Sequence, residues 1–338
     1  MSAASEAWRA GSLRTGAPPL LLYLELTARC NSRCIMCYQA SDPIRNSPDM
    51  TLPLARATAD RLFPTAAVVD LRGFGETLIW PPLAEFLAHV AKSSQRPAFK
   101  LVSNAQPAGP WEALDEVGTH LRVSFDGPDR ETYEHIRAHS SFDRAIARLR
   151  WWNRRASADR RAWLLVTVQS GNVGRLQELV SLAVEEGCRG IFLVPVVAGP
   201  DAPWAVTAAS ADASIAPAAQ AALEQGLEVV FPHRLLPNVR RQHRARTLHA
   251  SSCSAPWTSL LIRHDGRFSP CSHFGMGLGT WPEEDPVDHP GVLEVRRGLL
   301  GGTPVARCVG CDRNALAYVS PDGTVHDPTW KVLERVHA

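Results

Sequence analysis

The stretch LLYLELTARCNSRCIMC, residues 21–37, joins a short apolar run to a loop that carries three cysteines. The run at 21–26 is typical of a buried β-strand. Comparable runs recur along the chain at 67–72, 99–103, 121–124, 163–169 and 191–197. Helical periodicity lies between several of them, at 83–92, 142–155 and 173–186, and Gly187 would cap the last of these helices. Alternating strands and helices predict an α/β fold with a parallel sheet.

Continuously apolar runs such as IFLVPVV favour strands that are covered on both faces, which indicates a barrel-like closure. The stretch 198–252 is rich in Ala and Pro and then basic, and we interpret it as a connector. Beyond it, Asp265-Gly266 and residues 321–323 are candidate hairpin turns. The predicted fold is a partial (β/α)6 TIM-type barrel at 18–230, a basic connector at 231–252, a small C-terminal α+β domain at 253–315 and a tail at 316–338.

Composition narrows the class of protein. The chain has 338 residues, of which 45% are hydrophobic and 21% charged, and this is enough to bury a large core. A net charge of +2 gives no global field that would favour a nucleic acid or a membrane surface as partner. The sequence shows neither the roughly 20 apolar residues of a spanning helix nor the apolar core of a signal peptide. We therefore expect a cytoplasmic protein.

Seven of the eight cysteines fall into two sets. The first set, Cys30, Cys34 and Cys37, lies in a segment without helical character, and a loop can wrap a cluster. A 4Fe-4S cube uses four ligands, so three thiolates leave one iron open to another molecule. A structural zinc site would need a fourth ligand, which no nearby Cys or His supplies. The remaining cysteine, Cys188, is expected to be a buried core residue.

The second set has four cysteines, enough to complete the ligands of either of two metal centres. Cys253 and Cys271 flank the predicted hairpin, and Cys308 and Cys311 follow it. Four thiolates suit structural zinc and a fully ligated iron-sulfur cluster equally well.

The CxxxCxxC spacing of the first set resembles the cysteine loop of the radical S-adenosylmethionine (SAM) superfamily. The resemblance implies that the amino and carboxylate groups of SAM chelate the open iron. Segments at the ends of the following strands strengthen it: Gly73-Phe74-Gly75-Glu76, Ser103-Asn104 and Ser124-Phe125-Asp126-Gly127. Two positions depart from the family pattern, since Met36 replaces an aromatic residue and Thr77 replaces a proline.

The resemblance implies a cofactor role for nine residues. Glu76 would pair with the SAM ammonium, Arg137 would reach its carboxylate, and Met36 would contact adenine through its backbone. Each motif also has an ordinary alternative: Asn and Asp-Gly mark common turns, Arg137 could be an exposed helix residue, and Val194 could be a core strand residue. The candidate SAM-binding residues are Met36, Gly75, Glu76, Ser103, Asn104, Ser124, Asp126, Arg137 and Val194.

The second set resembles a twitch domain, a shortened SPASM module with one auxiliary 4Fe-4S cluster, here held by Cys253, Cys271, Cys308 and Cys311. A closed cluster implies electron transfer or a structural role. The small domain would then be an iron-sulfur domain.

The family implies reductive cleavage of SAM to a 5'-deoxyadenosyl radical that abstracts hydrogen, with an electron donor such as flavodoxin or ferredoxin. Only about 20 residues precede the first strand, where peptide maturases carry a recognition domain, so we expect a small polar substrate. The arrangement of the second cysteine set most resembles that of enzymes that tailor aminocyclitols, aminoglycosides or nucleoside antibiotics. We expect oxidation of a secondary alcohol in a sugar, cyclitol or sugar-nucleoside. The alternatives are decarboxylation of a sugar acid, epimerisation, peptide maturation, and zinc binding without catalysis.

Overall fold

The computed structural model describes residues 3–37, 46–197, 199, 201–236, 253–272, 277–309, 311 and 316–326. The strands are β1 (Leu21–Leu24), β2 (Val68–Leu71), β3 (Ala98–Ser103), β4 (His120–Ser124), β5 (Trp163–Val168), β6 (Gly190–Pro195), β7 (Glu228–Pro232), β8 (Ser259–Ile262), β9 (Arg267–Ser269), β10 (Gly279–Thr280), β11 (Leu316–Val319) and β12 (Val325–His326). The α-helices are α1 (Ala3–Arg9), α2 (Leu52–Leu62), α3 (Leu83–Ala91), α4 (Trp111–Glu116), α5 (Arg130–Ile136), α6 (Phe142–Arg155), α7 (Leu176–Glu185), α8 (Ala208–Glu224), α10 (Ala255–Thr258) and α11 (Pro290–Leu300).

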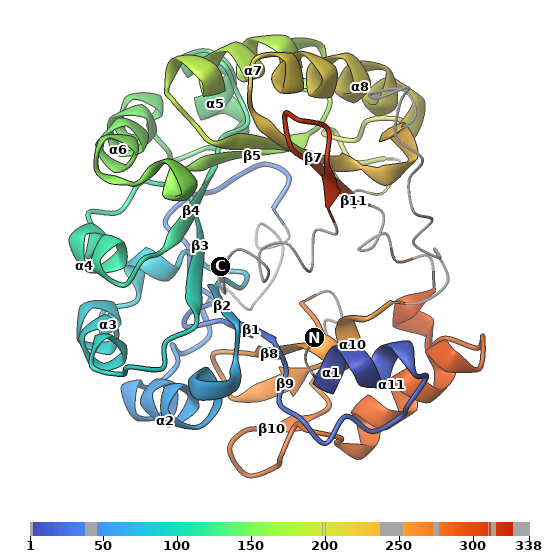
Figure 1. Ribbon diagram of the computed structural model, residues 1–338. Coiled ribbons are helices and arrows are strands. Elements are labelled where there is room, and N and C mark those ends of the chain that lie inside the picture. Colours follow the sequence, from blue (N-terminus) through green and yellow to red (C-terminus); the bar gives the residue numbers. More distant parts are fainter. Residues whose placement is uncertain are drawn as a thin grey trace.

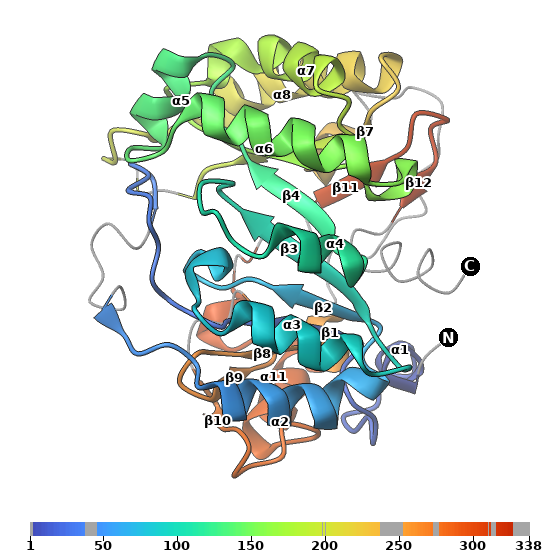
Figure 2. The same ribbon diagram turned by 90° about the vertical axis from the view of Figure 1, so that its left-hand side faces the viewer.

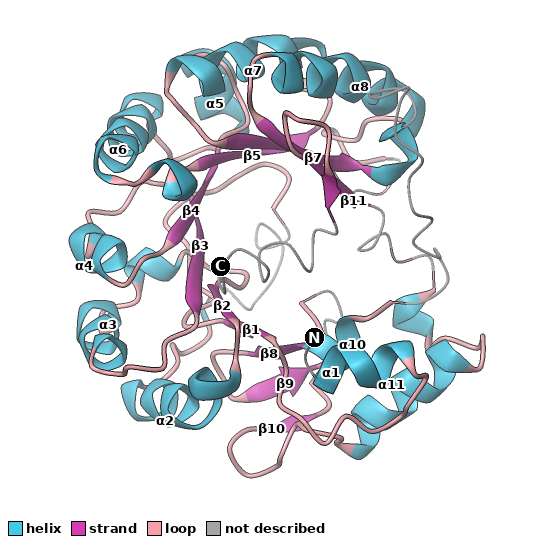
Figure 3. Ribbon diagram, in the orientation of Figure 1, coloured by secondary structure: helices cyan, strands magenta, loops and turns pink. Residues whose placement is uncertain are grey.

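The described strands form one curved sheet in the order β10-β9-β8-β1-β2-β3-β4-β5-β6-β7-β11-β12. Strands β1 to β7 pair in parallel, and helices α2 to α8 lie on the outer side of the curve (Figure 1). The two ends of the sheet do not pair with each other, so the barrel is open. Figure 2 shows the parallel strands from the side that the helices cover, and Figure 3 separates helices from strands. The predicted α/β partial barrel is therefore confirmed.

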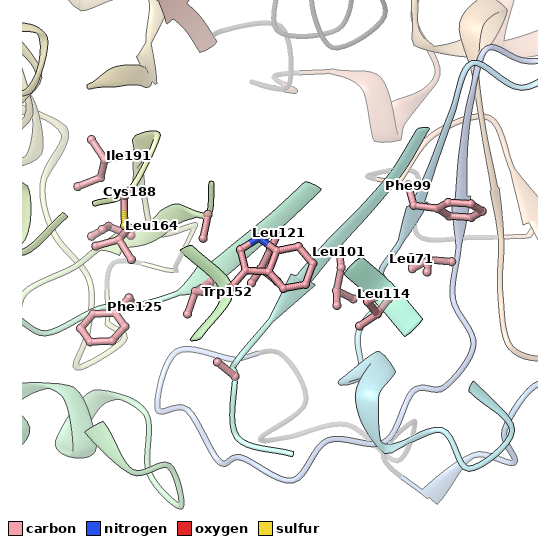
Figure 4. Close-up of a cluster of buried hydrophobic side chains, with 14 of the residues drawn as sticks. Leu71, Phe99, Leu101, Leu114, Leu121, Phe125, Trp152, Leu164, Cys188 and Ile191 are labelled. Carbon is pink, nitrogen blue, oxygen red and sulfur yellow. The ribbon is translucent and has the colours of Figure 1, made fainter. Parts of the chain in front are cut away.

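Side chains along each strand alternate between the helix-covered face and the concave face of the sheet. Leu101, Leu121 and Leu164 point to the helices and pack with Trp152 of α6 in the main core (Figure 4). The other face is the concave face of the sheet, where two smaller apolar clusters lie around Tyr23 and Phe192. Cys188 also lies in the main core, as predicted, and burial raises the pKa of its thiol to about 12.

The interpretation of 198–252 as a connector is wrong for much of its length, because α8 and β7 lie within it and continue the βα pattern. The Ala-rich sequence of α8 contains Pro217, which argues against a helix when only local sequence is considered. Tertiary packing overrides that signal, since buried alanines of α8 join the main core. Of the basic segment, Arg234 pairs with Asp212 of α8, while residues 237–252 lie outside the described part.

The C-terminal strands extend the barrel sheet. β8 runs parallel to β1, and the predicted hairpin turn at Asp265-Gly266 joins it to β9, with Gly266 at φ +81°. At the other end of the sheet β11 pairs with β7, and the predicted hairpin near 321–323 joins it to β12. In the described part of the chain, no helix has the length and apolarity to cross a membrane.

Candidate active site

The cysteine loop follows β1 directly and lies at the carboxyl edge of the parallel sheet, where barrel folds build their sites. No helix forms between residues 25 and 37, as predicted. The cysteine loop is held against the end of α5 and the residues that follow it, because Ile35 N donates to Ile136 O at 3.0 Å and Arg33 N donates to Ala138 O at 2.7 Å. Two parts of the chain that are distant in sequence therefore hold the loop in place.

The three thiols of the loop lie near one another. Cys34 is buried and Cys30 and Cys37 are half-buried. Burial raises the pKa of Cys30 to about 11, and the other two cysteines contribute to the rise. A metal centre binds thiolates, so binding would release these protons. Three neighbouring thiols on one loop fit a cluster that uses three protein ligands.

Arg137 is the cation of this site. It is only 6% exposed, which rules out the alternative of an exposed helix arginine. Its Nη2 lies 2.7 Å from Asp126 Oδ2, and its Nη1 donates to Cys34 Sγ at 3.6 Å. Asp126 Oδ1 also accepts a hydrogen bond from Thr167 N at 2.7 Å. The pair thus connects the loop after β4 and strand β5 to the cysteine loop and places positive charge beside the Cys34 thiol.

Changing Arg137→Met should destabilise the protein by about 3–5 kcal/mol, because it leaves the Asp126 carboxylate buried without its counter-charge. Urea denaturation of the apoprotein measures this. The double variant Arg137→Met, Asp126→Asn is the control and should recover most of the loss. Equal stability of the single variant and wild type would contradict the role of the ion pair.

The glycine-rich turn 73–76 packs directly against the cysteine loop. Glu76 N donates to Arg29 O at 2.8 Å. A Cβ on Gly75 would lie 2.3 Å from Thr27 O, so a larger residue would displace the loop. The neighbouring backbone therefore requires a glycine at this position, and the contact of Gly75 with SAM stays a prediction.

The Glu76 carboxylate is only 3% exposed and accepts three hydrogen bonds. Its Oε1 accepts from Ser103 Oγ at 3.0 Å and Leu78 N at 3.2 Å, and its Oε2 accepts from Asn104 N at 2.7 Å. Burial raises its pKa to about 7, and these bonds partly oppose the rise. Glu76 thus braces the loops after β2 and β3, and its pairing with the SAM ammonium stays a prediction.

The side-chain amide of Asn104 holds the cysteine loop in place. Its Nδ2 donates to Asn31 Oδ1 at 2.9 Å and to Ser32 Oγ at 2.8 Å, and lies 3.8 Å from Cys30 Sγ. Sequence reasoning missed Gln106. Its Nε2 donates hydrogen bonds to Asn104 O, Tyr133 Oη and Ser141 O. The available sequence signal was a long polar side chain, Gln106, among the small and apolar residues at 105–109.

The other candidate SAM residues lie around the same edge, and their contacts with SAM stay predictions. Ser124 ends β4 and is buried. Met36 is half-buried beside Cys37. Val194 lines a pocket between β6 and α8, together with Arg234.

The buried carboxylate of Glu25, which sequence reasoning missed, links the C-terminal hairpin to the carboxyl edge of the sheet. His264 Nδ1 lies 2.6 Å from Glu25 Oε1, and Phe74 N donates to Glu25 Oε2 at 2.8 Å. Arg263 Nε lies 3.5 Å from Glu25 Oε1. The hairpin β8–β9 therefore contacts both the end of β1 and the glycine-rich turn.

The second set of cysteines also comes together. Burial raises the pKa of Cys308 to about 11, and Cys271, Cys253 and Cys311 lie close enough to raise it further. All four are free thiols. Among the described residues, no three His, Cys, Asp or Glu side chains converge as one metal ion would require.

The fold and these contacts define an open α/β barrel with three neighbouring thiols at the carboxyl edge of its strands. Residues 24–171 match the model of the radical SAM superfamily, and the chain carries a domain of that superfamily.

A curated relative and two solved structures are similar to this chain. The AdoMet-dependent heme synthase of Methanosarcina barkeri is 28% identical over 192 residues, which cover 55% of this chain and 53% of the synthase. The chain thus spans about half the length of that relative. Streptococcus suis SuiB bound to S-adenosylmethionine has a TM-score of 0.61 at 14% identity, covering 87% of this chain and 71% of SuiB. The protein anSMEcpe with bound AdoMet and a peptide has a TM-score of 0.62 at 12% identity, covering 87% and 86%. These two likenesses concern the fold.

Proposed function

We propose that this protein is a radical SAM enzyme that abstracts hydrogen from a sugar, cyclitol or sugar-nucleoside and oxidises a secondary alcohol to a ketone. The observation that carries the proposal is the loop of Cys30, Cys34 and Cys37 at the carboxyl edge of the barrel. When bound there, a 4Fe-4S cluster with one open iron supplies the reductive cleavage of SAM.

The chain's own residues position these groups. Arg137 offsets the negative charge of ligand thiolates, and Asn104 keeps Cys30 and its neighbours in place. Glu76 connects the turn after β2 to the loop after β3. These side chains are buried, so water competes little with their hydrogen bonds.

The second cysteine set supports an oxidation. Converting a secondary alcohol to a ketone removes two protons and two electrons: a hydrogen atom leaves the carbon, and a proton and an electron leave afterwards. A fully ligated auxiliary cluster at Cys253, Cys271, Cys308 and Cys311 would accept that electron, as in a twitch module. An external donor such as flavodoxin or ferredoxin would supply the electron for SAM cleavage.

Two observations bear on the alternatives. Epimerisation needs a hydrogen donor facing the substrate, and Cys188 lies in the core between helices and sheet instead. Decarboxylation of a sugar acid is the second candidate, because cationic side chains lie on the concave face of the sheet.

Anaerobic reconstitution with iron and sulfide tests the proposal. We expect the broad visible absorbance of iron-sulfur clusters and, with SAM and dithionite, formation of 5'-deoxyadenosine. A cyclitol or sugar deuterated at the reacting carbon should transfer deuterium into 5'-deoxyadenosine. Tightly bound zinc with neither absorbance nor 5'-deoxyadenosine would refute the proposal and favour a zinc-binding protein without catalysis.

A further inference from the structure

The concave face of the sheet carries a group of charged side chains that the cysteine loop does not use. Asp70 of β2 is the cross-strand partner of Lys100 of β3, and Arg122 lies on the next strand, β4, opposite Val102. Their sequence neighbours Val69, Leu101, Leu121 and Val123 belong to the core on the helical side. By alternation, the charged side chains lie on the concave face of the sheet.

Lys100 is a buried cation. It is only 7% exposed, and the carboxylate of Asp70, its cross-strand partner, attracts its charge. Burial lowers its pKa well below its usual value, and repulsion from Arg122 adds to this. An unpaired buried charge is unfavourable unless something else compensates it. Asp70 is also engaged by Arg72, so it offsets the charge of Lys100 only in part, and this points to an anionic ligand.

The charges around Lys100 are unbalanced. Arg122 stacks on the ring of Phe192 at 4.4 Å, and burial lowers its pKa to about 10. The carboxylate of Asp70 is engaged by Arg72 at 3.2 Å through Oδ2, while its Oδ1 is buried without a hydrogen-bond partner. His120, opposite Lys100, has its pKa lowered to about 4 by burial and by Lys100, so it adds no charge at neutral pH. Three cations thus share one carboxylate.

The position of this group suits a substrate. Lys100 lies three residues before Ser103 at the end of β3, a distance of ~10 Å along a strand. Asn104, the next residue, holds the cysteine loop. A molecule about 10 Å long, held at Lys100, would therefore extend to the edge where SAM is proposed to bind.

We propose that Lys100 and Arg122 form an anion-binding subsite for a carboxylate or phosphate group of the substrate. Asp70 Oδ1 accepts a hydrogen bond from a hydroxyl group of the same molecule. The inference deepens the proposed function and rests on it for the identification of the bound molecule as substrate.

Thermal unfolding of the full-length reconstituted protein tests the subsite with two probes, acetate and inorganic phosphate, against chloride at equal ionic strength. We expect saturable stabilisation of wild type by at least one probe, and the responding probe identifies the group. The apparent Kd should weaken at least ~10-fold in Lys100→Met and in Arg122→Met. Without the probe, Lys100→Met should unfold at a higher temperature than wild type, because a buried charge that is offset only in part has been removed.

Lys92→Met and Arg148→Met are matched controls on the helical side of the sheet and should respond to the probes as wild type does. Equal responses of wild type and Lys100→Met would overturn the subsite, as would a lower unfolding temperature of Lys100→Met in chloride, which would indicate a structural lysine. The proposed function fails separately: it fails if no 5'-deoxyadenosine forms, whereas the subsite fails if neither probe binds.

Discussion

Replacement of Cys30, Cys34 and Cys37 by alanine is expected to abolish the formation of 5'-deoxyadenosine. The three thiols are the protein ligands that one loop offers at the barrel edge, and no cluster binds there without them. Chromatography of anaerobic reactions with SAM and dithionite measures the product. The reconstituted variant should also contain close to half the iron of wild type, since the second set remains.

The matched control is Cys188→Ala. This thiol is buried in the core and belongs to neither set, so iron content and SAM cleavage should stay at wild-type levels while stability falls. Persistent 5'-deoxyadenosine in the triple variant would refute the assignment of the loop. Loss of iron in Cys188→Ala would contradict the independence of Cys188 from both cysteine sets.

Replacement of Cys308 and Cys311 by alanine should also remove close to half of the iron, but with a different effect on catalysis. Cys308 lies near the other three cysteines of its set, so losing two of four ligands should empty that site alone. Some SAM cleavage should persist, because the first loop is untouched. Ketone formation should be lost, because the auxiliary cluster would no longer accept the electron.

Iron and acid-labile sulfide analysis, together with 5'-deoxyadenosine and ketone assays, distinguishes the outcomes. Unchanged iron content would contradict an auxiliary cluster. Bound zinc at this set in wild type, with iron confined to the first, would leave the radical SAM proposal intact and replace electron transfer with a structural role.

Much of the fold could be predicted from local patterns. Short apolar runs separated by periodic segments indicated strands β1 to β6, and Phe142–Arg155 is the helix that its periodicity predicted. The seventh unit was missed because the Ala-rich α8 contains Pro217 and carries little periodic signal. Its stability comes from packing on the sheet, which local sequence does not report.

The spacing of Cys30, Cys34 and Cys37 was enough to predict a three-ligand site, since ligand number and spacing are properties of the chain itself. The family resemblance named Glu76, Asn104, Asp126 and Arg137 as candidates, but only the tertiary structure decided how they contact one another and the cysteine loop. Arg137 became buried beside Cys34, and Glu76 was saturated by hydrogen bonds from neighbouring loops. Lys100 and Arg122 share the concave face because strand register brings distant positions together. Burial and pairing depend on contacts between segments far apart in sequence, so no local pattern could have shown them.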